Sequence, residues 1–386
     1  PYLMDARTEV CGGLTLLADI KVQPTAVNPL TGLEGFTGTN SCIVAHPKKS
    51  MRAVATRKGD MAKIMQTTGS LTLENYTVSK AGAKGKHHHT FGGLIVDVDR
   101  EGQFYIRRVT INKDGTAYDL DRKFSFQKVW ENQSVEGIVL GDLHFWWMDH
   151  QADLAARNLI SKLNPRQVVL HDVIDSYSIS HHHNNKPFTN FSKHHNGMNN
   201  IRDEIKDFIE WVKTLDVDLN NVNIVPSNHH EHIFRWIEEH DWKNDPENAE
   251  FYLETALFML KNTYVSSEGT ETPDPFSWWV NRFCEDINMI GEDESLTIGP
   301  YECGMHGHKG PNGSRGSLTN LSKLGVPVIH GHCHSPGEDG SSIAVGVNTN
   351  DMEYTSGPSG WLQSNAVIYP DGNASLIHTI KGKFMG

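Results

Sequence analysis

Hydrophobic and polar positions change their pattern near residue 130 of this 386-residue chain. Before that point, short apolar runs such as 40–46 and 69–78 stand between turn-forming residues. Residues 92–120 alternate apolar and polar side chains around Asp-Arg-Glu-Gly and Asn-Lys-Asp-Gly. Alternation around such turns predicts antiparallel strands joined as a meander. We therefore predict a β-rich N-terminal region over residues 1–130.

One segment of this region differs from its surroundings. Residues 79–93 are basic and rich in glycine, which predicts a mobile loop. The triple histidine His87–His89 can touch nucleic acid or metal, but composition alone favours a solvated loop. The N-terminal region as a whole can guide substrate, bind a second copy or another protein, or add strands to a common core. The sequence does not choose among these roles.

From residue 135 onward, short apolar runs alternate with longer amphipathic segments. The apolar runs are Gly-Ile-Val-Leu, Gln-Val-Val-Leu, Val-Asn-Ile-Val, Ser-Leu-Thr-Ile and Val-Pro-Val-Ile, and the helical patterns cover 149–163, 201–215, 247–264 and 275–287. Such alternation predicts an α/β domain over residues 131–386, with strands buried under helices on both sides. Ligands of open α/β sheets bind beyond the carboxyl ends of the strands, so the residues after each apolar run are the candidates for a site.

Each of these five apolar runs is followed by Asp, Asn or His side chains. In chain order they are Asp142 and His144, Asp172 and Asp175, Asn228 and His229, His306 and His308, and His332 and His334. Taken singly, an Asp-x-His or a His-x-His is more often a capping or turn pair than a metal site. Five such elements at five successive strand ends are hard to reconcile with chance, and together they predict a metal site.

Composition adds two constraints on that site. The chain has 22 histidines, and histidine is the commonest metal ligand in proteins. The formal net charge is −12, which counts against a nucleic-acid partner because phosphate binding depends mainly on Lys and Arg. That objection weakens where bound metal neutralises several carboxylates.

Cysteine usage and hydropathy suggest a compartment. The five cysteines are widely scattered and odd in number, which favours a reducing cytoplasm over a disulfide framework: Cys11, Cys42, Cys284, Cys303 and Cys333. We find no apolar run long enough to cross a bilayer, and the first residues lack a signal-peptide pattern. We therefore predict a cytoplasmic protein without a membrane partner. Because the chain begins at Pro1 and not at Met, we expect it to lie inside a longer gene product.

The order of the five blocks resembles the calcineurin-like metallophosphoesterases. The blocks D-x-H, D-x-x-D, N-H, H and G-H-x-H cover about residues 135–345. The resemblance implies an α/β fold with a metallophosphoesterase β-sandwich flanked by helices. Two departures concern the loops: His171 stands where the family usually has glycine, and Ser227 and His230 alter its Gly-Asn-His-Glu block.

The resemblance also implies two divalent ions and their ligands. Carried over residue by residue, Asp142, His144 and His334 hold one ion, Asn228, His306 and His332 hold the other, and Asp172 bridges them. Two ions roughly 3.5–4 Å apart can clamp the attacking and leaving oxygens of a phosphoryl transfer, with a bridging hydroxide as nucleophile. Manganese is the expected metal, and iron or zinc would fit the same residues.

Two further residues match non-ligand positions of the family. His229 corresponds to a histidine that protonates the leaving oxygen or stabilises charge on the phosphate. Asp175 would orient a histidine from outside the coordination sphere. Between His306 and His308 the ligand is uncertain from sequence, and we favour His306 because it follows its strand more closely.

The neighbours of the last two blocks suggest where substrate would lie. With His306 as ligand, His308, Lys309 and Arg315 would face substrate. Cys333 sits between two proposed ligands, and strand alternation would point it to the opposite face, into the core.

The substrate must be inferred from the surroundings of the site, because the family hydrolyses many phosphate esters. The His-rich segment 176–200 can bind a phosphodiester backbone or stack bases on Tyr177, Phe188 and Phe191, and a long solvated loop is an equal alternative. The blocks resemble the nuclease branch typified by double-strand-break repair nucleases, and more specifically early DNA-degradation proteins of T5-like bacteriophages. That resemblance implies DNA as substrate, and host cytoplasm for a phage-encoded protein.

Two other functions remain in view. A small-molecule phosphatase or nucleotidase of the same superfamily agrees better with the net charge of −12. A non-catalytic metal-bound scaffold is disfavoured because both ligand sets and His229 look intact. Endo- or exonucleolytic action, strand preference and oligomeric state, including a homo-oligomer formed through residues 1–130, are left open.

Overall fold

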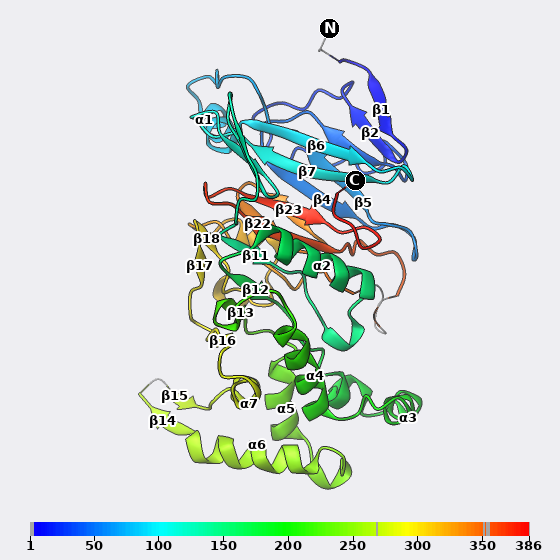
Figure 1. Ribbon diagram of the computed structural model, residues 1–386, viewed down its shortest axis with the longest axis vertical. Helices are drawn as coiled ribbons and strands as arrows, with labels where there is room; N and C mark the ends of the chain where they lie inside the picture. The colour runs from blue at the N-terminus through cyan, green and yellow to red at the C-terminus, as the bar shows by residue number, and fades with distance from the viewer. Residues whose placement is uncertain (1–3, 268, 350–351, 353–355, 386) are drawn as a thin grey trace.

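The computed structural model describes residues 4–267, 269–349, 352 and 356–385. Strands fill the upper half of the molecule in Figure 1, and most of the helices lie below them. The described residues form several sheets and eight α-helices. The α/β class expected from the sequence is therefore confirmed.

A six-stranded sheet carries the first three of the predicted strand ends. Its parallel part contains β11, β12, β13 and β16, and β22 and β23 extend it antiparallel at one edge. Because parallel strands end at the same edge, the residues that follow them come together. In sheet order the strands are β16 (Asn288–Met289), β13 (Val222–Ile224), β12 (Val168–Leu170), β11 (Gly137–Val139), β22 (Ser364–Ile368) and β23 (Ala374–His378).

Helices cover one face of this sheet. Ile138 and Val168 point into a core that the helices complete. In the first helix, Asp149 caps the backbone N–H of Ala152, and the buried residues recur every three or four positions. All four predicted helices are confirmed, and the helices that contribute to this core are α2 (His150–Leu163), α4 (Ile201–Lys213), α5 (Glu231–Glu239), α6 (Ala249–Asn262) and α7 (Pro275–Phe283). None of the described helices is long and apolar enough to span a bilayer.

The opposite face packs against a second sheet, so the expectation of helices on both sides was wrong. Val139 and Val169 share a core with Ile43 and Ile343 of that sheet. The strand residues alternate between the two cores because successive side chains of a strand point to opposite faces. The second sheet runs in the order β1 (Arg7–Cys11), β2 (Leu14–Leu17), β3 (Ser41–Val44), β5 (Lys63–Thr67), β4 (Ser50–Val54), β20 (Gly337–Asp339), β21 (Ser342–Ala344) and β19 (Ile329–His330).

This second sheet contains strands from both ends of the chain. β4 pairs antiparallel with β20, which joins residues near position 50 to residues near position 338. The sheet thus spans both sides of the predicted boundary at residue 130, and that boundary stays a prediction.

The predicted meander is confirmed. β6 (Gly92–Val98) and β7 (Phe104–Thr110) pair antiparallel, and Gly102 N–H donates to Asp99 C=O in the turn between them. A bridge between Ile111 and Ala117 closes the second turn. The chain continues into a three-stranded sheet of β8 (Ala117–Asp119), β9 (Arg122–Phe124) and β10 (Val129–Trp130).

Two predictions for residues 69–93 were wrong. Residues 71–78 form no strand, and Leu71 and Leu73 stay exposed because no buried face receives them. The segment predicted as a loop contains α1 (Lys80–His88). Ser79 caps this helix, and basic residues in its last turn suit the negative end of the helix dipole. Glycine was misleading here because Gly82 lies so close to the Thr77 carbonyl that a Cβ would not fit.

The last two apolar runs form strands outside the six-stranded sheet. Residues 295–298 contribute β17 (Thr297–Ile298), which pairs with β18 (Tyr301–Glu302), and residues 326–329 lead into β19. The remaining elements are short connectors or protrusions: α3 (Pro187–His195), α8 (Leu318–Leu321), β14 (Tyr264–Ser266), β15 (Gly269–Glu271), η1 (Phe145–Trp147), η2 (Tyr177–Ile179), η3 (His181–His183), η4 (Leu219–Asn221), η5 (Trp242–Asn244) and η6 (Pro311–Gly313).

A buried ion pair ties the β6–β7 hairpin to the eight-stranded sheet. Arg108 Nε lies 2.9 Å from Glu338 Oε2, and the two side chains are only 1% and 2% exposed. Arg108 also donates to Thr67 Oγ1 at 3.4 Å. Each charged group is stabilised mainly by the other, because neither side chain is accessible to water.

We expect Glu338→Ala to lower the free energy of unfolding by about 3–5 kcal/mol, because Arg108 would stay buried without its partner. Replacing both residues, as Arg108→Met with Glu338→Leu, should recover most of the loss. Breaking the exposed Arg52–Glu34 pair with Glu34→Ala is the matched control and should cost less than about 1 kcal/mol. Urea denaturation measures all three, and a double variant as unstable as Glu338→Ala would contradict the assignment.

Candidate metal centre

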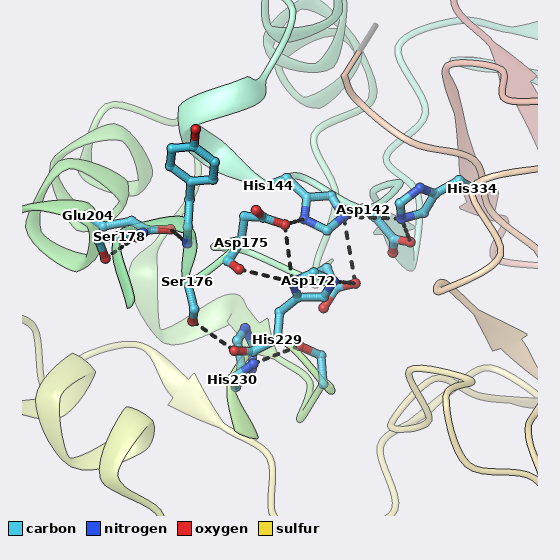
Figure 2. A network of polar contacts seen from close by, with 12 residues as sticks. Asp142, His144, Asp172, Asp175, Ser176, Ser178, Glu204, His229, His230 and His334 are labelled. Carbon is cyan, nitrogen blue, oxygen red and sulfur yellow. Dashed lines mark hydrogen bonds and ion pairs between the residues drawn. The ribbon is translucent and has the colours of Figure 1, made fainter. Parts of the chain in front are cut away.

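The segments that follow β11 and β12 run side by side and present three acidic or imidazole side chains to one another. Leu143 N–H donates to His171 C=O at 3.1 Å, and His144 N–H donates to Asp172 C=O at 2.7 Å. These bonds continue the pairing beyond the strands. Asp142, His144 and Asp172 are almost fully buried, and Figure 2 shows them converging.

Several residues of the site have a left-handed backbone. The φ angles are 41° for His144, 40° for Asp172, 70° for His332 and 55° for His334. This region is sparsely populated by residues other than glycine, and such conformations cluster at functional sites. The abrupt turns end each strand and direct the following side chains into one shared space.

Three groups of possible ligand atoms come together, and within each of them one atom of every residue lies within 4.8 Å of the others. One group is His144, Asp175 and His229. The other two share Asp172: they are Asp142, His144, Asp172 and His334, and Asp172, His306 and His332. His334 Nε2 lies 3.1 Å from Asp142 Oδ2, and His306 Nε2 lies 3.0 Å from Asp172 Oδ2. The residues assigned to two ions from the sequence are therefore brought together, with the expected bridging residue common to the last two groups.

Asn228 completes the surroundings of the group formed by Asp172, His306 and His332. It lines the same cavity as Asp172 and His332. Its side-chain Oδ1 is buried and has no hydrogen-bond partner in the described part of the chain. A buried amide oxygen without a donor is suited to a cation.

The buried carboxylates and rings lack ordinary hydrogen-bond partners. Among the described residues, the oxygens of Asp142 and Asp172 and both ring nitrogens of His306 have no hydrogen bond of good geometry, although they lie close to one another. Burying such groups without compensation is costly. Mixed carboxylate and imidazole donors are ligands for divalent first-row metals. These buried Asp and His groups can therefore hold metal ions.

The electrostatics agree with this donor set. Burial raises the pKa of Asp142 to about 7, and a neighbouring cation would favour its ionised form. Burial opposes ionisation of Asp172 too, but His306 and His229 hold the pKa of Asp172 well below its usual range. Burial lowers the pKa of His334 to about 4, so its ring is neutral near pH 7, as a metal ligand must be.

His229 and Asp175 form a second arrangement beside the two groups that share Asp172. Asp175 Oδ1 lies 3.2 Å from His144 Nδ1 and 3.1 Å from His229 Nδ1, so one carboxylate orients two rings (Figure 2). The Asp175 carbonyl lies 3.0 Å from His229 Nδ1. Burial disfavours the charged ring, but Asp172 and Asp175 raise the pKa of His229 to about 10. Its Nε2 is left on the side of Asp172, at 4.0 Å from Oδ2.

Comparison with known proteins identifies one relative of the chain. It is 32% identical over 387 residues to Protein A1 of Escherichia phage T5, a match that covers 95% of this chain and 68% of the relative. The chain belongs to the Protein A1 family. No family model matches it, and no solved structure matches it. The expected similarity to a protein of a T5-like phage is confirmed, whereas the A1 name itself says nothing about superfamily or activity.

In this A1-family protein, His306 and His308 have different surroundings. His306 is 2% exposed and lies against Asp172, whereas His308 Nε2 lies 3.5 Å from Glu231 Oε1. Lys309 pairs with Glu231 at 2.9 Å and also with Glu292. The geometry agrees with His306 as the ligand, a role that stays a prediction.

A cavity of about 770 Å³ opens above these groups. Of the three residues expected to face substrate, only Arg315 lines it. Cys333 also lines it and is half-buried, so its expected place in the core was wrong. The reason is that His332 and His334 turn the backbone, and strand alternation does not apply there.

Segment 176–200 is ordered, although its sequence was compatible with a long loop. It forms η2, η3 and α3. Tyr177 lines the cavity, whereas Phe188 and Phe191 lie on α3 and are 88% and 69% exposed outside it. Glu204 of α4 fixes the start of the segment, accepting from Ser178 Oγ at 2.7 Å and from Tyr177 N–H at 3.1 Å.

Sequence reasoning missed two neighbours of the centre. Glu204 occupies the buried face of a helix, and burial raises its pKa to about 7. A carboxylate on the apolar face of an amphipathic helix was the one available signal. Trp361 packs edge-on against His334, with ring centroids 4.3 Å apart. Nothing in the sequence around Trp361 marks this contact.

We expect His306→Ala to weaken Mn²⁺ binding by at least about tenfold, because losing even an orienting group around a metal has an effect of that size. His308→Ala is the matched control from the same loop and should bind Mn²⁺ like the wild type. Calorimetric titration of metal-stripped protein measures both affinities. Equal losses in the two variants, or unchanged metal content in Asp142→Ala/His144→Ala, would contradict the site.

Gly331 offers a second test without removing any ligand. A Cβ at this position would lie 2.2 Å from Asp142 Oδ1, so Gly331→Ala should displace the carboxylate and lower the Mn²⁺ affinity. Gly325→Ala is the control, because nothing lies within 4 Å of its added Cβ. The same titration checks both variants, and normal Mn²⁺ binding by Gly331→Ala would argue against Asp142 as a ligand.

Proposed function

We propose that this chain is a dinuclear metal-dependent phosphodiesterase of the calcineurin-like metallophosphoesterase superfamily, and that it cleaves DNA. The observation that carries the proposal is the pair of ligand groups sharing Asp172. Two-metal phosphoesterases need such a shared carboxylate between mixed nitrogen and oxygen ligands. The unsatisfied buried atoms of Asp142, Asp172 and Asn228 support the same assignment.

The architecture supports the superfamily assignment. Two sheets share a core, and helices cover the outer face of the sheet that carries Asp142 and Asp172. The ligand groups lie beyond the carboxyl ends of β11 and β12, where ligands of parallel sheets bind. This arrangement agrees with a metallophosphoesterase β-sandwich flanked by helices.

In this proposal Asp142, His144, Asp172 and His334 would hold one ion, and Asp172, Asn228, His306 and His332 the other. When bound, two divalent ions supply an activated water and neutralise charge on the phosphate. Manganese suits the combined oxygen and imidazole donors, and iron or zinc would also fit. The Asp142 and Asp172 carboxylates are themselves shielded from bulk water.

His229 would act on the leaving oxygen. Its Nδ1 is committed to Asp175, which leaves Nε2–H on the cavity side to donate a proton. As the bond between phosphorus and the leaving oxygen breaks, that proton passes to the oxygen and prevents an unstable alkoxide from forming. Asp175 is then a positioning residue, because it holds both the His229 and the His144 rings.

DNA is the proposed substrate because the motif blocks resemble nucleases of this superfamily and because the relative is a phage protein. The net charge of −12 favours the second candidate, a phosphatase or nucleotidase acting on a small ester. The two candidates use the same metal chemistry and differ in the substrate that enters the cavity.

Metal-stripped protein given Mn²⁺ should cleave linear single- or double-stranded DNA and should also hydrolyse a phosphodiester dye. His229→Ala should lower kcat on DNA by about 10²–10⁴-fold, the usual contribution of a general acid. His308→Ala is the control and should retain activity. Gel electrophoresis and dye absorbance give the two readouts. If the protein hydrolyses the dye but leaves DNA intact, the nuclease function is rejected and the small-ester candidate is favoured. If it hydrolyses neither the dye nor DNA, the whole proposal is rejected.

A further inference from the structure

The cavity above the metal centre has a buried acidic floor and an exposed cationic rim. Asp172 and Asp175 are 1% and 7% exposed on the floor, whereas Lys186 and Arg315 line the same cavity and are exposed. In the part of the chain that the structure describes, no carboxylate forms an ion pair with Lys186 or Arg315. Lys309, in the same loop as Arg315, does pair with acidic side chains.

These two cations are set apart by their position on the cavity, because other exposed cations such as Arg57, Arg100 and Lys84 also lack an ion pair among the described residues. Two unpaired cations around one cavity therefore point to an anion that comes from outside the protein.

The backbone around both cations is fixed. Arg315 C=O accepts from Asn320 Nδ2 at 2.8 Å, and the next residue, Gly316, packs so closely on Gly307 that a Cβ would not fit. Lys186 N–H donates to His183 C=O at 2.9 Å, and Lys186 C=O accepts from Asn190 N–H at 3.0 Å. These contacts restrain the backbone next to both cations, which reduces the entropic cost of binding.

We propose that Lys186 and Arg315 bind the phosphates that flank the scissile phosphate of an unpaired nucleic-acid strand. This inference rests on the proposed function, because that function places the scissile phosphate at Asp172. An isolated phosphate ester would reach the floor but leave the rim unoccupied. The two residues are therefore positioning residues that select a polynucleotide over a small ester.

The walls of the cavity favour an unpaired strand. Trp147 lines it and is half-buried, whereas Tyr177 beneath it is only 6% exposed and has Lys193 Nζ 4.8 Å from its ring centroid, so of the two only Trp147 can meet a base. Aromatic side chains beside a cationic groove bind single strands by stacking on bases without reading their sequence. The volume of about 770 Å³ lies in the range of small-ligand pockets, so the floor has room for a nucleotide that has left a base-paired stack.

The direct test is binding of a fluorescent single-stranded oligonucleotide to Mn²⁺-loaded His229→Ala protein, in which turnover is slow, followed by anisotropy across a series of salt concentrations; each rim substitution is made in this background. Each lost phosphate contact should raise Kd and reduce the slope of log K against log salt by about 0.7. Lys186→Ala and Arg315→Ala should each raise Kd about five- to tenfold, because a contact that neutralises one phosphate makes a contribution of that order. Lys186→Arg and Arg315→Lys keep the charge and should restore most of the affinity.

Lys309→Ala is the matched control, because this cation is already paired and should change neither Kd nor the salt slope. Unchanged Kd in Lys186→Ala and Arg315→Ala, or an equal rise in Lys309→Ala, would overturn the proposal. A rise in Kd without a change of slope would also overturn it, since it would indicate a structural effect and not a phosphate contact.

A second readout separates this inference from the proposed function. With Mn²⁺ present, the ratio of kcat/KM on the oligonucleotide to kcat/KM on the phosphodiester dye should fall at least about fivefold in Arg315→Ala, mainly through KM. If wild-type protein hydrolyses both substrates and the ratio is unchanged in Arg315→Ala, the role proposed for Lys186 and Arg315 is contradicted and the proposed function is not. Wild-type protein that hydrolyses neither contradicts the proposed function and the inference together.

Discussion

Two carboxylates, Asp142 and Asp172, are buried side by side in the structure, and no described residue gives either of them a hydrogen bond of good geometry. Buried anions are stable only where positive charge compensates them. Imidazole rings surround both, and the two carboxylates influence each other's ionisation. Strand ends from several parts of the chain bring these donors together in one buried space.

The fold assembles these donors by ending strands abruptly. Left-handed residues at His144, Asp172, His332 and His334 turn the chain as soon as each strand or bridge is complete. Close backbone approach is possible because Gly331 leaves room for the Asp142 carboxylate. α4 then supports the site from behind, where Glu204 holds the segment that carries Ser176, whose hydroxyl donates to the His229 carbonyl at 2.8 Å. Packing of distant elements thus sets the geometry of a few donor atoms.

The sequence predicted the parts of this arrangement that are encoded locally. An amphipathic stripe over 150–163 identifies α2, and the donor residues after β11 and β12 identify the centre. The second sheet was not predictable, because β4 pairs with a strand nearly three hundred positions away and short strands give no signal for such a partner. Only part of the cationic rim could be predicted from the sequence. Arg315 lies in a loop that was expected to face substrate, whereas the position of Lys186 depends on the folding of η3 and α3. Glycine and histidine suggested a loop where α1 forms. The helix forms because capping by Ser79 and tight packing outweigh the poor helix propensity of these residues.

The pairing of β4 with β20 also has a consequence for synthesis of the chain on the ribosome. Strands near residue 50 emerge early, but their partner at Gly337–Asp339 emerges only after His332 and His334. Until then one edge of the second sheet is open, and open edges of this kind are prone to aggregation. Completion of the sheet and delivery of the last two histidines therefore coincide, so that a nascent chain stopped before residue 332 has neither a closed sheet nor a full set of donors.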